Sequence, residues 1–225
     1  MIQLKSFKIL CGIALLLSLF QTSSSQTLNI NNLKKENKNI VSLYTGLEYG
    51  LVFGVGYGYK LNSNKPIILG VEFSIPAGDN PVDDFKTKFG GQIVLHRDRN
   101  FYFSGKVQGI FRQNSNDYVR LQNFGAEVSG TMGYFKRKWF TALDIGFDKA
   151  IVTRFTHSGS YKLIHPGVQD GWYEPATGGN LNLGVQVGYS FKHNDLYIKG
   201  GKLATQSFSN PSLPFYALIG YAVKF

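Results

Sequence analysis

The last residues of the chain, Leu213–Phe225, read LPFYALIGYAVKF and alternate between two kinds of side chain. The odd positions are all apolar or aromatic, whereas the even positions include Gly220, Ala222 and Lys224. Because successive side chains of a β-strand point to opposite faces, this stretch predicts a strand with one apolar and one mixed face. In a soluble sandwich the apolar face would pack on a second sheet, and in a membrane barrel it would contact lipid.

The other end of the chain, residues 1–25, has the features of a secretory signal peptide. Lys5 and Lys8 precede an apolar stretch from Ile9 to Phe20, and serines follow before a predicted cleavage point at Gln26. The stretch is too short for a transmembrane helix, and a buried core helix is the alternative. The only cysteine, Cys11, lies inside it, so the mature chain would contain no thiol and no disulfide. A polar tail, residues 26–39, would then precede the folded domain.

From Leu43 onward the apolar period is two, and it stays so to the end of the chain. We predict strands at 43–61, 67–76, 85–96, 101–111, 122–135, 139–151, 181–191, 196–203 and 213–225. Short turns follow residues 61, 96, 135 and 191, and longer loops, including 112–120 and 153–180, follow the others. Closed bacterial barrels have an even number of strands. We therefore expect ten, with residues 39–48 forming an extra strand, and eight as the alternative.

The alternation of short and long connections separates the two fold classes. Transmembrane barrels have short periplasmic turns and longer outer loops, whereas a soluble sandwich has no reason to sort its loops in this way. We therefore predict an all-β fold, a single antiparallel transmembrane β-barrel over residues 40–225. With the signal sequence and the terminal Phe225, the pattern resembles the small outer-membrane β-barrel proteins of Gram-negative bacteria, such as the OmpA, OmpX and OmpW types. The resemblance implies an outer-membrane location and recognition of the final strand, GYAVKF, by the outer-membrane assembly machinery.

The charge of the chain is strongly positive, with 24 basic and 14 acidic residues. Basic proteins often bind nucleic acid, but here the basic residues are scattered and several fall in the short turns. We therefore exclude nucleic acid and expect the positive charge to contact anionic lipid headgroups or lipopolysaccharide.

Charged residues recur on the face opposite the apolar one, and in a membrane barrel that face lines the lumen. The candidate charge network comprises Glu48, Glu72, Lys106, Glu127, Asp144, Asp148 and Lys224, and the same face also receives Lys60, Lys86, Lys88, His96 and Lys199. Buried charges must be paired or hydrated. The order of the strands suggests that Glu72 pairs with Lys86 or Lys88, Lys106 with Glu127, and Lys224 with Glu48. The lumen is then either a salt-bridged plug or a narrow polar channel.

The predicted loop at 153–180 is the longest connection and the best place for a site. Its candidate residues are His157, His165, Asp170, Trp172, Tyr173 and Glu174. Histidine, Ser158 or Ser160 and a carboxylate are the components of nucleophilic catalysis, and two histidines with two carboxylates could ligate zinc. The alternative is an aromatic anchor around Trp172 and Tyr173 that folds the loop over the barrel mouth or contacts a partner protein.

No catalytic motif or standard metal-ligand spacing occurs in the sequence, so we expect no cofactor and no bound metal. The favoured function is that of a non-enzymatic membrane protein: a narrow channel, a structural barrel or an accessory subunit of an outer-membrane assembly. The alternative is a hydrolase or acyltransferase that acts on membrane lipids through the loop at 153–180.

Overall fold

The structure is a computed structural model, and it describes residues 37–78, 83–174, 179–206 and 213–225. The predicted signal peptide and most of the predicted tail lie outside these residues. The described chain forms one antiparallel sheet that closes on itself. Its strands are β1 (Asn39–Leu47), β2 (Leu51–Lys60), β3 (Ile67–Pro76), β4 (Phe85–Asp98), β5 (Phe101–Ser115), β6 (Val119–Phe135), β7 (Trp139–His157), β9 (Asn180–Phe191), β10 (Asn194–Thr205) and β11 (Phe215–Lys224).

These ten strands make a closed barrel. The C-terminal strand β11 pairs with β1 over eight residues, and β6 and β7 join the two halves of the sheet. The expectation of ten strands is therefore confirmed, and residues 39–48 supply the additional one. The long alternating run from Leu43 to Leu61 is divided by a tight connection at residues 48–50.

The outer surface of the barrel is apolar on every strand. Exposed leucine, valine, isoleucine and phenylalanine side chains alternate with buried ones, and the exposed set includes Leu43, Val55, Val71, Val107, Ile145 and Ile198. Strands β1, β2, β3 and β11 are nine or ten residues long, close to the length of about 9–11 residues that spans a bilayer as a tilted strand.

The inner wall is filled by aromatic rings that lie over glycines. One hydrogen-bonded row of the sheet runs through Phe140, Gly188, Tyr197, Gly220, Tyr44 and Gly54. Each ring covers the next glycine, where an added Cβ would come within 2.0–2.2 Å of the ring. Glycine is therefore needed on this face because the neighbouring strand supplies the side chain that fills the space.

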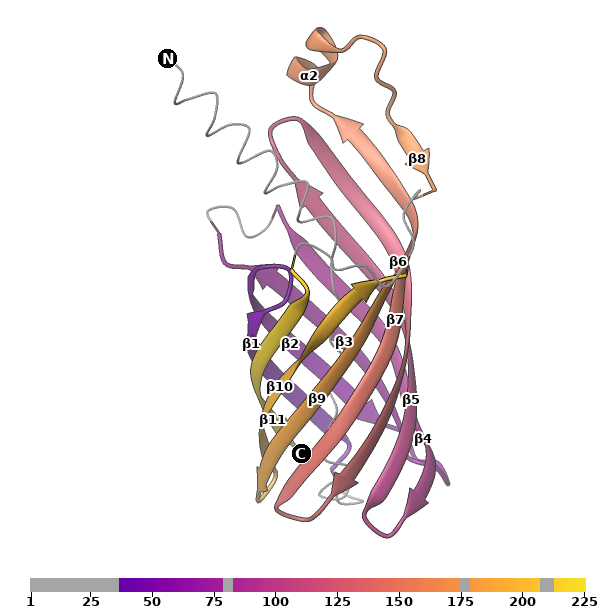
Figure 1. Ribbon diagram of the computed structural model, residues 1–225, viewed down its shortest axis with the longest axis vertical. Coiled ribbons are helices and arrows are strands. Elements are labelled where there is room, and N and C mark those ends of the chain that lie inside the picture. The colour runs from indigo at the N-terminus through magenta and orange to yellow at the C-terminus, as the bar shows by residue number, and fades with distance from the viewer. Residues whose placement is uncertain (1–36, 79–82, 175–178, 207–212) are drawn as a thin grey trace.

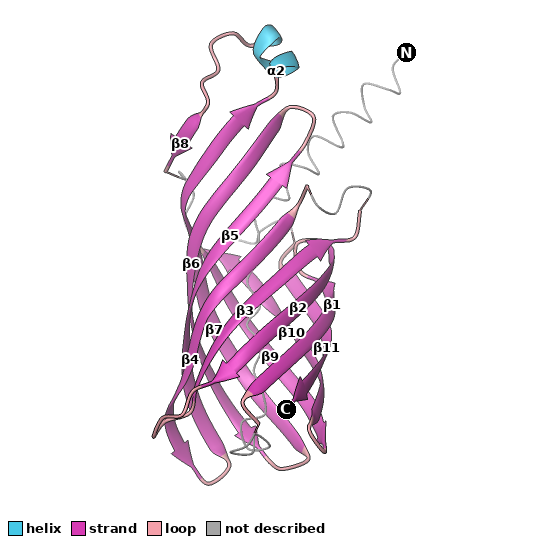
Figure 2. Cartoon of the chain, turned by 180° about the vertical axis from the view of Figure 1, so that it is seen from behind, coloured by secondary structure: helices cyan, strands magenta, loops and turns pink. Residues whose placement is uncertain are grey.

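The two ends of the barrel differ. The connections β2–β3, β4–β5, β6–β7 and β9–β10 lie at one end, which we call the short-turn end, and the remaining connections lie at the long-loop end (Figure 2). On one side of the long-loop end, β5, β6 and β7 rise well above the shorter strands (Figure 1).

The raised part, residues 114–123 and 150–173, is called the outer extension here. It includes helix α2 (Gly159–Ile164) and the short strand β8 (Gly171–Tyr173), which pairs with β7 above the point where β9 leaves it. The prediction of a loop at 112–120 is wrong, because β5 and β6 continue as a paired hairpin with Ser115 opposite Arg120. The predicted loop at 153–180 likewise begins with strand structure up to His157.

Candidate functional site

Among the residues that the structure describes, six ion pairs lie in the lumen, with side chains at most 12% exposed. Six cations and six carboxylates take part, and each cation contacts one carboxylate: Lys86–Glu48, Lys88–Glu127, Lys106–Glu72, Arg112–Asp148, Lys199–Asp144 and Lys224–Asp195. The structure places all seven residues of the proposed charge network in this set. Because the two signs balance, the interior carries no net charge from these groups.

The partners differ from those suggested by strand order. Glu72 contacts Lys106 at 2.9 Å, Glu127 contacts Lys88 at 3.3 Å, and Lys224 contacts Asp195 at 2.6 Å. Four of the six pairs skip one strand, as between β3 and β5 or between β4 and β6. Inward side chains converge toward the barrel axis, so a long lysine or arginine reaches past its neighbour to the next strand but one.

Sequence reasoning missed two of the twelve residues. Arg112 falls in the predicted loop at 112–120, yet it continues the inward alternation of Gln108 and Ile110 and donates a hydrogen bond of 2.6 Å to Asp148. Asp195 was assigned to a turn, although it is in phase with Lys199 on β10. Extending each alternating pattern by one or two residues would have found both. In contrast, His96 was expected in the lumen, but it follows a register shift after Val94 and is exposed.

Two buried clusters of aromatic and aliphatic side chains also face the lumen. Toward the short-turn end, Tyr102 packs edge-on against Phe135, and Phe135 stacks on Phe140 with ring centroids 5.6 Å apart. Toward the long-loop end, Tyr44, Val52 and Leu218 form a second buried cluster. Side chains therefore occupy the lumen toward both ends, through the two clusters, and between them, through ion pairs such as Lys88–Glu127.

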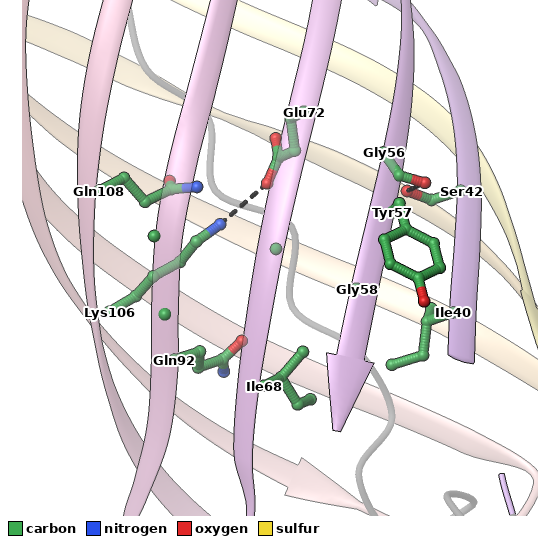
Figure 3. A pocket seen from close by; sticks show the side chains of 13 residues that line it. Ile40, Ser42, Gly56, Tyr57, Gly58, Ile68, Glu72, Gln92, Lys106 and Gln108 are labelled. Atoms are coloured by element: carbon green, nitrogen blue, oxygen red, sulfur yellow. Dashed lines mark hydrogen bonds and ion pairs between the residues drawn. The ribbon is translucent and has the colours of Figure 1, made fainter. Parts of the chain in front are cut away.

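A small cavity of about 50 Å³ remains beside the Lys106–Glu72 pair (Figure 3). Inward glycines, including Gly58 and Gly70, leave this space, and the cavity is large enough for a few water molecules. Glu72 Oε2 and Gln108 Oε1 are buried here without a hydrogen bond to another described protein group. The cavity thus offers hydration to the most exposed of the six pairs, but its volume is too small for a solute path.

The candidate residues of the long connection gather in the outer extension. His157 ends β7, His165 caps the C-terminal end of α2, Asp170 precedes β8, and Trp172 and Tyr173 lie within β8. Glu174 follows β8 and is exposed. Helix α2 starts with Ser158 as its N-cap, since the Ser158 side chain accepts a hydrogen bond from the Tyr161 backbone N–H.

Asp170 holds this connection together. Its Oδ1 accepts hydrogen bonds from the backbone N–H of His157 at 2.9 Å and contacts His157 Nδ1 at 3.0 Å, while Oδ2 accepts one from Lys162 at 2.6 Å. The backbone N–H of His157, together with Lys162, holds the pKa of the Asp170 carboxyl well below its usual range. The carboxylate therefore links the end of β7, the helix and the segment before β8.

The same geometry provides only part of a catalytic triad. Asp170 orients His157, but the hydroxyls of Ser158 and Ser160 contact one another at 3.0 Å and neither contacts the His157 ring. That ring instead stacks on Tyr161, with centroids 5.4 Å apart. Residues 153–174 thus form a structural cluster in which no described hydroxyl is positioned for activation by the histidine.

The zinc hypothesis also lacks a geometric basis. Within residues 37–78, 83–174, 179–206 and 213–225, no three histidine, cysteine or acidic side chains are grouped so that they could hold a metal ion. His165 lies against Tyr161, at 4.8 Å between ring centroids, and only His157 reaches Asp170.

None of the described helices has the length and apolar character needed to cross a membrane.

Trp172 anchors the extension to the outer wall. Its ring lies 5.9 Å from that of Phe124 on β6, and the guanidinium of Arg154 is 5.8 Å from its centroid. Tyr173 makes an edge contact with Phe155. The aromatic pair therefore packs on opposite faces of the extension, where Trp172 and Tyr173 are about half exposed.

No family model matches the chain, and no curated protein matches it. Among solved structures, a KdgM porin has a TM-score of 0.45 and 10% sequence identity, covering 83% of this chain and 99% of that chain. A KdgM porin in complex with disordered oligogalacturonate has a TM-score of 0.42 at the same identity and coverage.

The geometry of the chain itself defines its structural class. It is a closed, all-antiparallel, ten-stranded β-barrel with an apolar exterior and a polar, charge-paired interior, which is the architecture of outer-membrane barrels.

Proposed function

We propose that this protein is an integral outer-membrane β-barrel without catalytic activity, whose lumen is closed and whose outer extension serves as an accessory or contact surface. The observation that carries this proposal is the one-to-one pairing of six inward cations with six inward carboxylates, each side chain at least 88% buried. In an open channel, charged groups of the wall would be exposed to water instead.

Membrane residence is supported by the exterior. Large apolar side chains face outward on all ten barrel strands, and a soluble protein rarely exposes such a continuous surface. The proposed contacts are outer-membrane lipid and lipopolysaccharide around this surface. Recognition by the outer-membrane assembly machinery would use β11, which ends next to Phe225 and forms the closing seam with β1.

The closed lumen is tested by planar-bilayer conductance of the refolded chain from Gln26 to Phe225. We expect a heat-modifiable, folded protein that gives no discrete conductance steps. Glu127→Ala should also give none, because the aromatic clusters on either side of the Lys88–Glu127 pair stay in place. Replacing Phe135, Phe140 and Tyr197 of one cluster together with Tyr44 and Leu218 of the other by alanine should produce steps. Reproducible steps from the unmodified chain would refute the closed lumen, and new steps from Glu127→Ala alone would assign the gate to that pair.

A further inference from the structure

The short-turn end of the barrel is surrounded by positive charge. Its four turns and the adjoining end of β4 carry seven exposed basic side chains: Lys65, Arg97, Arg99, Lys136, Arg137, Lys138 and Lys192. Lys38, which is half-buried, lies at the same end beside the start of β1. Lys60 ends β2 in phase with the inward-facing Gly56 and Gly58, on the lumen face where it was predicted. We call the seven exposed residues and Lys38 the cationic collar.

Acidic side chains are nearly absent from this end. Six carboxylates are used in the lumen, and Asp83, Asp84, Asp117, Asp170 and Glu174 belong to the connections of the long-loop end. Among the residues that the structure describes, the carboxylates next to the four turns are Asp98, which ends β4, and Asp195, which is buried against Lys224. Among the described residues, the excess positive charge is therefore concentrated at the short-turn end.

The collar lies next to outward-facing aromatic residues. The ammonium group of Lys136 is 5.7 Å from the ring centroid of Tyr134 and 5.6 Å from that of Trp139. Phe101 makes an edge contact with Tyr134, and Tyr189 and Phe191 on β9 are stacked. Aromatic residues on the outer surface of a barrel sit at the membrane interface, so the adjacent cations lie at the depth of the lipid phosphates.

We propose that the cationic collar binds anionic phospholipid headgroups of the leaflet around the short-turn end; this rests on the proposed membrane residence. The cations occur in all four turns around the circumference, which fits a ring of headgroups better than one docked acidic protein. Each basic residue near an anionic surface favours the anionic lipid by about fivefold.

The two tryptophans of the chain allow a direct test, because Trp139 borders the collar and Trp172 lies in the outer extension. In the Trp172→Phe variant, Trp139 is the only tryptophan reporter. The refolded protein is placed in vesicles of equal parts phosphatidylglycerol and phosphatidylcholine, with brominated chains on one lipid or the other. Bromine quenches only tryptophans that it contacts, so the ratio of the two quenching values measures which lipid surrounds Trp139.

We expect brominated phosphatidylglycerol to quench Trp139 several times more strongly than brominated phosphatidylcholine. Replacing Lys136, Arg137 and Lys138 together by glutamine should abolish the difference. A matched triple change at the other end, of Arg120, Arg154 and Lys162 to glutamine, should leave it unchanged. Equal quenching by both lipids in the parent, or a preference that persists without the three turn cations, would overturn the proposal.

Two further results would be distinguishable from these. Quenching by neither lipid would contradict membrane residence itself, and with it both proposals. Equal quenching by both lipids together with tight binding of soluble polyglutamate would overturn the lipid proposal and assign the collar to an acidic macromolecule.

Discussion

At the scale of single residues, the lumen depends on pairs and not on individual charges. Lys224 and Asp195 are 0% and 1% exposed, and their charged atoms lie 2.6 Å apart. Taking two charges out of water costs several kcal/mol for each ion, and the cost is offset only while both partners are present. Either residue alone would be an uncompensated charge between β10 and β11.

We therefore expect Lys224→Met to destabilise the folded barrel by about 3–5 kcal/mol, since Asp195 is left buried without its cation. The double variant Lys224→Met with Asp195→Leu should recover most of this loss. Urea unfolding of the refolded protein, followed by its heat-modifiable gel mobility, measures both. Equal stability of the single variant and the parent would show that water or another group satisfies Asp195.

The exposed cluster around Asp170 predicts a pH dependence of the outer extension. Its hydrogen bonds to His157 and Lys162 lower the pKa of the folded carboxyl below the value of the unfolded chain, about 3.9. The stabilisation from Asp170 is thus fully present above that value and is lost as the pH falls toward the lower folded pKa. In the Trp139→Phe variant, Trp172 fluorescence should stay constant from pH 7 to pH 5 and change below about pH 4. Asp170→Asn should remove this transition; if it persists, another group controls it.

At the scale of strands, the inner wall depends on the alternation of rings and glycines. A Cβ added to Gly220 would lie 2.2 Å from the Tyr197 ring, whereas one added to Gly70 would meet only the Tyr57 carbonyl oxygen, at 3.2 Å. Both glycines face the lumen, but only the first is covered by an aromatic side chain.

Gly220→Ala should therefore destabilise the barrel by about 1–3 kcal/mol through overpacking, and Gly70→Ala should have a clearly smaller effect. Urea midpoints of the two variants, measured under the same conditions, provide the comparison. Similar losses for both would mean that glycine is needed for the backbone of these strands and not for the packing of Tyr197.

The strands themselves were largely predictable because lipid-facing residues impose a strict period of two. The prediction failed at residues 112–120, where polar and apolar side chains no longer alternate. This polar stretch was predicted as a loop, although β5 and β6 are paired there as far as Ser115 and Arg120. The division between β1 and β2 was uncertain for a related reason, because Glu48 and Gly50 continue the alternation through the turn.

At the scale of the whole molecule, the residues of the candidate lumen site followed from alternation, but their partners did not. Ion pairing such as Arg112 with Asp148 depends on the curvature and register of the closed barrel, and strand order contains neither. The pairing within the outer extension could not be predicted from the sequence either, because β8 replaces β9 as the partner of β7 only above residue 148.

The ladder between β6 and β7 joins the outer extension to the barrel wall, and it decides how the extension responds to force. Strands β6 and β7 stay paired from the turn at residues 136–138 to Val119 and His157, with one register shift between Phe124 and Gly125 at the base of the outer extension. A sideways load on α2 would be shared by many backbone hydrogen bonds of a continuous sheet rather than absorbed by a hinge. We therefore expect the extension to behave as a stiff post, which holds whatever it contacts at a fixed height above the bilayer and transmits any displacement of that partner to the barrel wall.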